Sequence, residues 1–77
     1  MKEGEKLIYK NLLEAMKKEN VTFKQIGNLL DCRYQTVSDI VNGVTKKGFY
    51  YDDAINIQRV LFPTYSTEYL FQRDKVS

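Results

Sequence analysis

The chain of 77 residues has no histidine and no tryptophan, and it has a single cysteine and a single proline. With only Cys32, no internal disulfide can form, which is typical of a reducing compartment. Without histidine, zinc sites, Cys–His nucleophiles and histidine general bases are excluded. Asp52 and Asp53 are adjacent, an arrangement that favours the first turn of a helix over paired acid–base chemistry. We therefore expect no enzyme, no metal and no cofactor.

Long apolar runs and a strong charge of one sign are also missing. No apolar run approaches the ~18 residues of a membrane span, and the N-terminal "MKEGEK" is not followed by the apolar stretch of a secretory signal. We expect a cytoplasmic protein with no membrane or small-molecule partner. Twelve Lys and Arg against ten Asp and Glu give a net charge of +2. This charge is too small to indicate nucleic-acid binding by itself, so the position of the charges has to decide.

Apolar residues at helical spacing dominate the sequence, which has the length of one domain, residues 1–77. A stripe built on Leu12 predicts a helix from about residue 5 to 18. Thr22 with Gln25 three positions later is a capping box, so a second helix is predicted to begin there and to end near Asp31. A third helix is predicted over about 33–42. A fourth is predicted to start near residues 50–52 and to be ended by Pro63. A fifth is predicted over about 64–71, and residues 73–77 are predicted to be a loose tail.

Five short helices and no sheet predict a compact all-α bundle. Only about three residues separate the second and third helices, and so short a link forces them into a helix-turn-helix crossing. We expect Gly27 where the two helices approach most closely, because a side chain there would push them apart. Cys32 in the turn is interpreted as a small buried core residue rather than a reactive thiol.

The segment "TFKQIGNLLDCRYQTVSDIVNG", residues 22–43, resembles the Xre-type helix-turn-helix of phage Cro and repressor proteins. The matching positions are Thr22, Gly27, Asp31, Thr36-Val37-Ser38 and Asn42-Gly43. The stretch "IQRVLFP…STEYLF" is also similar to the tail of small regulators from phages and mobile elements. The resemblance implies a lambda-repressor-like fold and a sequence-specific transcriptional regulator that binds double-stranded DNA and represses by occupying an operator.

Two residues depart from the family pattern. The family usually has glycine at the turn, and Asp31 tolerates the left-handed conformation better than most residues do. The family often has Gln after the capping Thr, where it reaches a phosphate. Phe23 cannot make that contact.

The resemblance implies that the N-terminal half of the third helix faces base edges in the major groove. The residues at the base-reading positions are Tyr34, Gln35, Ser38 and Asp39. Gln can bond adenine, and Asp can accept from the cytosine amino group. The alternative is a merely solvated face, but short Gln, Thr, Ser and Asn side chains suit close approach to another molecule. Asp39 either rejects wrong bases or pairs with a nearby Lys or Arg.

Phosphate contacts are expected on both sides of this helix. Lys46 and Lys47 follow it directly, where related proteins hold the DNA backbone, although in isolation "TKK" would be a solvated loop. The other expected phosphate-binding positions are Thr22, Lys24, Arg33, Thr36, Asn42, Thr45 and the backbone N–H of Val44.

Seven of the ten aromatic residues lie between 49 and 71. They are Phe49, Tyr50, Tyr51, Phe62, Tyr65, Tyr69 and Phe71. The surplus over a small core favours a homodimer through this region, and a thick aromatic core in a monomer is the alternative. The low net charge, Phe23 and Asp39 also leave open a second function. This is a protein-interaction module, such as an antirepressor or inhibitor, that keeps the fold without binding DNA.

Overall fold

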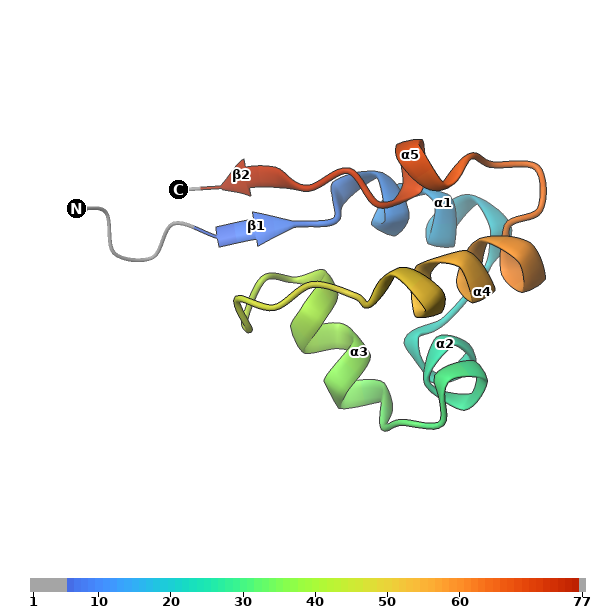
Figure 1. Ribbon diagram of the computed structural model, residues 1–77, viewed down its shortest axis with the longest axis horizontal. Coiled ribbons are helices and arrows are strands. Elements are labelled where there is room, and N and C mark those ends of the chain that lie inside the picture. The colour runs from blue at the N-terminus through green and yellow to red at the C-terminus, as the bar shows by residue number, and fades with distance from the viewer. Residues whose placement is uncertain (1–5, 77) are drawn as a thin grey trace.

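The computed structural model describes residues 6–76, which contain five helices and two short strands. In chain order these are β1 (Lys6–Ile8), α1 (Lys10–Glu19), α2 (Phe23–Leu30), α3 (Tyr34–Val41), α4 (Tyr51–Leu61), α5 (Thr67–Leu70) and β2 (Asp74–Val76), as Figure 1 shows. The prediction of a small, mainly helical bundle is confirmed. The described chain also has no strand between residues 22 and 62, as predicted.

Helices begin and end where the sequence supplies caps and stops. The Thr22 hydroxyl accepts the Gln25 N–H at 3.2 Å, and the Thr22 N–H donates to Gln25 Oε1 at 2.8 Å, which completes the capping box of α2. Ser66 caps α5 by accepting the Tyr69 N–H at 3.1 Å. Helix α4 ends at Leu61, shortly before Pro63. Each cap satisfies backbone groups that the helix leaves unpaired.

The core receives side chains from every helix. The largest fully buried ones are Leu12, Ile26, Val37, Val41, Ile57, Phe62 and Leu70. Burying an aliphatic side chain of this size stabilises a fold by about 1.5–3 kcal/mol. Because Val37 and Val41 both lie on α3, one side of that helix is fixed against the bundle. No helix within residues 6–76 has the length and apolar composition needed to cross a bilayer.

Gly27 lies where α2 meets the turn into α3. A Cβ atom on this residue would lie 2.7 Å from the Cys32 carbonyl oxygen and 3.3 Å from the Tyr34 nitrogen. Both are backbone atoms, which cannot move aside as a flexible side chain can. The turn itself passes through Asp31 at φ 60°, in the left-handed region. The predicted close approach at Gly27 and the left-handed Asp31 are both confirmed.

The two ends of the chain differ from the prediction. Lys6–Ile8 is a strand rather than the start of α1, and it pairs antiparallel with Asp74–Val76 in the register Lys6↔Val76, Leu7↔Lys75 and Ile8↔Asp74. The prediction of no sheet is therefore wrong, and so is that of a loose tail over 74–76. Residue 5, where the first helix was predicted to start, and Ser77 lie outside the described residues. β1 and β2 together form a two-stranded β-ribbon, and Figure 1 shows this ribbon extending away from the helices.

Tyr9 explains why the chain is extended before α1. Its N–H donates to the Val41 carbonyl at 3.0 Å, which ties this segment to the end of α3 instead of to a helical turn. The guanidinium of Arg73 lies 5.2 Å from the centre of the Tyr9 ring. This contact brings the C-terminal segment beside the N-terminal one, so the two strands can pair.

Cys32 is exposed, so the prediction of a buried core residue is wrong. The group that packs against Gly27 is the Cys32 carbonyl rather than its thiol. Partial burial raises the pKa of the thiol, and the carboxylates of Asp53 and Asp31 raise that pKa further. Both causes disfavour the thiolate, as expected for an acid that is desolvated and close to negative charges.

Candidate functional site

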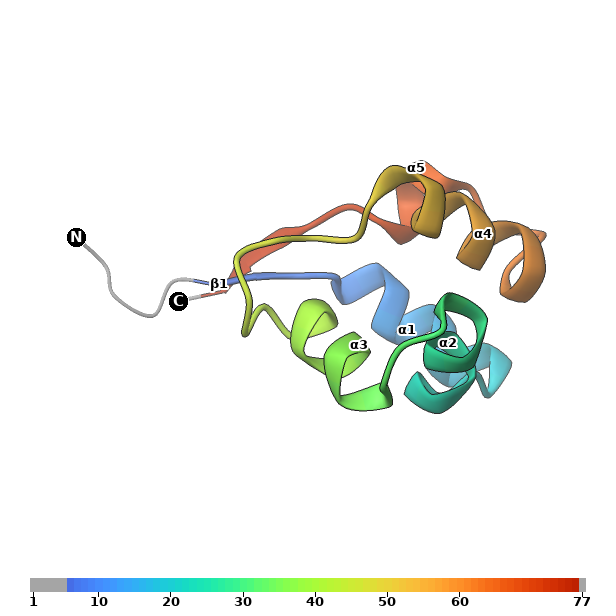
Figure 2. The ribbon, with the colours of Figure 1, turned by 60° about the horizontal axis from the view of Figure 1, so that its bottom comes forward.

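Helix α3 presents a polar surface on the side away from the core. Val37 and Val41 are completely buried, whereas Gln35 and Asn42 are exposed and Tyr34 is 58% exposed. The helix lies at the edge of the bundle in both ribbon views (Figures 1 and 2), with α2 beside it. The side of α3 opposite Val37 is therefore open to another molecule.

The four candidate base-reading residues lie together on α3. Tyr34 and Gln35 are exposed in its first turn, and Ser38 and Asp39 are half-buried one turn later. Residues four apart in a helix lie on the same side. Gln35 and Asp39 therefore share one arc, and Tyr34 and Ser38 lie beside it.

Asp39 has a partner that the sequence analysis did not anticipate. Gln35 Nε2 donates a hydrogen bond to Asp39 Oδ1 at 3.2 Å. The bond holds both side chains against the surface of the helix. The bond to Asp39 uses one amide hydrogen of Gln35, so the Gln35 carbonyl oxygen and the second amide hydrogen are available to other partners.

Asn42, at the C-terminal end of α3, folds back on its own helix. Its Nδ2 donates to the Ser38 carbonyl at 3.0 Å and lies 3.3 Å from the Ser38 hydroxyl. The Ser38 carbonyl also accepts the Asn42 backbone N–H at 2.9 Å, so the side chain adds a second hydrogen bond to the same oxygen. The Val44 N–H, an expected phosphate donor, donates to the Asp39 carbonyl at 2.9 Å. A phosphate would have to compete with both of these bonds.

The other expected phosphate-binding residues lie on both flanks of α3. Lys24 is exposed in the first turn of α2, and Arg33 is exposed at the position just before α3. Thr36 is exposed on α3 itself. The Thr22 hydroxyl accepts the Gln25 N–H and donates to Gln25 Oε1 at 3.3 Å within the capping box, so a phosphate would have to compete for its hydrogen.

The loop after α3 carries Lys46 and Lys47, which are both exposed. The Thr45 hydroxyl donates to the Lys47 carbonyl at 3.3 Å. The Lys47 ammonium donates to the Tyr50 hydroxyl at 2.8 Å and lies 4.8 Å from the centre of that ring. The two predicted basic residues are thus part of a loop with internal structure rather than a freely moving one.

This loop is fixed to the base of the ribbon, which it approaches in Figure 2. The rings of Tyr9, Phe49 and Phe71 form a cluster with centres 5.2 to 5.9 Å apart. The Phe49 N–H donates to the Tyr9 hydroxyl at 3.0 Å, and Arg73 Nη2 donates to the Lys46 carbonyl at 3.2 Å. Sequence reasoning missed Tyr9 and Arg73 because the residues they hold are distant in the chain.

A hollow of about 220 Å³ separates the loop from the flank of α3. Thr36 and Ile40 line it from α3, Lys47 and Tyr50 line it from the loop, and Asp53 lines it from α4. The loop and α3 therefore line the same hollow and lie side by side.

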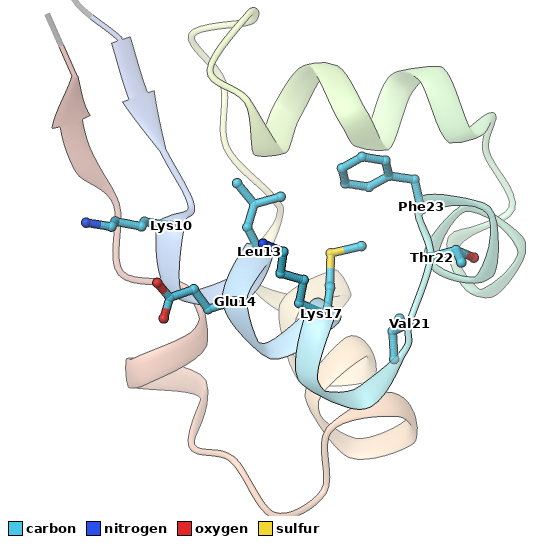
Figure 3. A pocket seen from close by; sticks show the side chains of 8 residues that line it. Lys10, Leu13, Glu14, Lys17, Val21, Thr22 and Phe23 are labelled. Atoms are coloured by element: carbon cyan, nitrogen blue, oxygen red, sulfur yellow. The ribbon is translucent and has the colours of Figure 1, made fainter.

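An apolar groove of about 510 Å³ lies on another side, between α1 and the start of α2. Leu13 and Phe23 point toward one another across it in Figure 3. Met16 and Val21 add to its apolar lining, and Lys10 and Lys17 also border it. Phe23, at the position where the resemblance implied a phosphate-binding Gln, is half-buried here against the core.

The aromatic region 49–71 is divided between core and surface. Phe62 is buried, and Phe49, Tyr65 and Phe71 pack against the core. Tyr50, Tyr51 and Tyr69 are exposed. The surplus of aromatic residues over the core therefore consists of tyrosines.

Within the described part of the chain, no group of three or more His, Cys, Asp or Glu side chains is arranged to hold a metal ion. Comparison of the chain with protein-family models, with curated proteins and with solved structures finds no match. The function has to be inferred from the residues and geometry of this chain.

Proposed function

We propose that the protein is a sequence-specific regulator of transcription that binds double-stranded DNA and acts as a repressor of the phage or mobile-element type. The observation that carries the proposal is the polar side of α3, which no other element of residues 6–76 covers. Its buried side, Val37 and Val41, anchors the helix to the bundle. An α-helix of this kind fits the major groove of B-DNA, which is about 12 Å wide.

Gln35 is the residue best placed to select a base. It lies in the first turn of α3, which enters the groove first in helix-turn-helix proteins. Its hydrogen bond to Asp39 limits its rotation before DNA arrives, so less conformational entropy is lost on binding. In this proposal Gln35 contacts an adenine and Asp39 both orients Gln35 and disfavours bases that present only acceptors.

The positive charges support the same orientation. Lys24 and Arg33 lie on the N-terminal side of α2 and α3, and Lys46 and Lys47 follow the C-terminal end of α3. Contacts on both flanks would fix α3 in register on the duplex. This placement would present positive charge to a duplex even though the net charge of the chain is only +2.

We further propose a cytoplasmic protein that forms a homodimer through the aromatic 49–71 region, with Tyr69 at the interface. Tyr69 is 41% exposed and stacks on Tyr65, and tyrosine is enriched in protein interfaces. A symmetric dimer would place two α3 helices about one DNA turn, roughly 34 Å, apart. Sedimentation equilibrium at micromolar concentration measures the stoichiometry, and a monomer at all concentrations would contradict the dimer.

Selection from a random duplex library tests the function. The protein is expected to enrich one sequence, and fluorescence anisotropy should then give tighter binding to that duplex than to a scrambled one. Asn56→Ala, an exposed change on α4, is the matched control for changes on α3 and should retain the preference. Absence of enrichment together with absence of salt-dependent duplex binding would contradict the proposal.

The apolar groove between α1 and α2 favours a second candidate function. Its lining of Leu13, Met16, Val21 and Phe23 resembles the grooves that bind amphipathic helices. In this alternative the protein is an interaction module, such as an antirepressor or inhibitor. The two functions differ in the anisotropy experiment, because an interaction module without DNA binding gives no salt-dependent signal with any duplex.

A further inference from the structure

Tyr50 is an exposed tyrosine whose hydroxyl is held in place by a hydrogen bond from Lys47. Its side chain is 63% exposed, and its hydroxyl accepts a hydrogen bond from the Lys47 ammonium at 2.8 Å. It borders the same hollow as Thr36 of α3. An exposed tyrosine so close to the proposed reading helix is available to a ligand that α3 binds.

We propose that Tyr50 is a DNA phosphate-binding residue and that Lys47 and Tyr50 bind one phosphate oxygen together. The proposal rests on the function proposed above and extends its phosphate-binding set. The Tyr50 oxygen uses a lone pair to accept from Lys47, so its own hydrogen remains free to donate. A hydroxyl that accepts from a cation is also a stronger donor, because the charge polarises its O–H bond.

The geometry suits a shared anion. The Lys47 nitrogen and the Tyr50 oxygen are 2.8 Å apart, and hydrogen bonds from each donor to an oxyanion have a length of about 2.5–2.9 Å. One phosphate oxygen can therefore lie at hydrogen-bonding distance from both donors. The ammonium retains two further hydrogens, because the bond to Tyr50 uses one of three.

Lys47 and Tyr50 each follow a residue whose backbone is held by contacts with the rest of the molecule. Phe49, next to Tyr50 in the chain, is held by its ring contacts and by the hydrogen bond from its N–H to the Tyr9 hydroxyl. Arg73 holds the carbonyl of Lys46, next to Lys47. Because these contacts order the loop during folding, binding a phosphate costs little additional conformational entropy.

The surrounding charges locate the phosphate. Asp53 lines the hollow between α3 and the loop, so a phosphate inside that hollow would meet a carboxylate. A phosphate bound at the exposed rim of the hollow, beside Lys47 and Tyr50, would avoid repulsion by the Asp53 carboxylate. The proposed contact therefore lies at the mouth of the hollow, which Thr36 of α3 also lines.

Tyr50→Phe tests the proposal, and Tyr51→Phe is its matched control. Tyr51 is the next residue and is 77% exposed, so the control removes a hydroxyl from a neighbouring exposed tyrosine. Anisotropy is measured on the selected duplex and on a scrambled one, from low to moderate salt. Tyr50→Phe should weaken binding to both duplexes about five- to twentyfold, because phosphate contacts are independent of sequence. Tyr51→Phe should bind like the parent.

The salt dependence separates the hydroxyl from the ammonium. Tyr50→Phe removes no charge, so the slope of log K against log salt should equal that of the parent. Lys47→Ala should flatten this slope by up to about one unit. In the double variant the two losses should be less than additive, since both groups bind one oxygen.

Parent-like binding by Tyr50→Phe would overturn the proposal, and so would an equal loss in Tyr51→Phe. Either result leaves the DNA-binding function intact, because the parent still binds. Failure of the parent itself to bind any duplex overturns the proposed function, and this inference with it.

Discussion

Gly27 is the residue on which the crossing of α2 and α3 depends. A Cβ there would lie 2.7 Å from the Cys32 carbonyl oxygen. Gly27→Ala should therefore lower the free energy of unfolding by about 1–3 kcal/mol, the usual effect of overpacking a tight contact. This outcome is opposite to the ~1 kcal/mol gain that alanine brings at an open helix position. Urea unfolding checks the prediction, and an unchanged or stabilised variant would contradict it.

Gln35 carries the prediction about base reading. Gln35→Ala should weaken binding to the selected duplex by about 1–3 kcal/mol and hardly affect binding to random duplex, which depends on phosphates. The side chain is exposed and lies opposite Val37, so the melting temperature should barely change. Competition with single-base variants of the duplex measures the effect. An unchanged preference at every base position would remove Gln35 from the reading set.

Cys32 should react slowly with alkylating reagents even though it is exposed. Partial burial and then the charges of Asp53 and Asp31 raise its pKa, so the thiolate fraction at pH 7 is smaller than in a free thiol of pKa about 8.5. The labelling rate should rise with pH and stay below that of a model thiol at neutral pH. Time courses with iodoacetamide, followed by mass spectrometry, measure this rate.

A matched pair of variants identifies the cause of that slow labelling. Asp53→Asn removes the larger of the two carboxylate contributions, so the pKa should fall and the labelling rate at pH 7 should rise. Asp52→Asn, the neighbouring exposed residue, is the control. Equal rates in the two variants would show that Asp53 is not involved.

At the scale of elements, local signals predicted the central part of the fold well. The capping box at Thr22, the left-handed turn at Asp31 and the stop before Pro63 depend on residues close together in sequence. The ribbon could not be predicted in this way. Its strands of three residues each come from opposite ends of the chain, and three residues are too few for an alternating pattern to be recognised.

The candidate site was predicted in part for the same reason. Helix periodicity correctly placed Gln35 and Asp39 on the side of α3 opposite Val37, but it could not predict the hydrogen bond between them, because their spacing permits other partners. The Cys32 backbone carbonyl, and not the thiol, occupies the space beside Gly27, and the thiol is exposed. The identity of residue 32 does not indicate which of these two groups packs against Gly27, so the exposure of the thiol could not be predicted.

The loop that carries Lys46 and Lys47 depends on Tyr9 for its position. Tyr9→Phe keeps the ring cluster and removes the acceptor of the Phe49 N–H, which should cost about 1–2 kcal/mol since this N–H is left without its partner. Hydrogen exchange of the Phe49 amide should accelerate. Tyr65→Phe is the control, because the Tyr65 hydroxyl donates to the exposed Glu19 carboxylate and not to the loop. This variant should leave the exchange rate of the Phe49 amide unchanged. Equal exchange in parent and Tyr9→Phe would contradict this anchoring role.

At the scale of the whole molecule, the arrangement of charge matters more than its sum. Ten acidic groups nearly balance twelve basic ones, so a uniform distribution would give weak attraction to DNA. If Lys46 contacts a phosphate, Lys46→Ala should weaken binding to all duplexes alike and flatten the salt slope by up to about one unit. Arg59→Ala, an exposed change in the last turn of α4, removes the same charge at a position outside the proposed interface. Because both variants have the same net charge, a larger loss in Lys46→Ala measured by anisotropy over a salt series would assign the effect to position. Equal losses would mean that net charge alone governs binding.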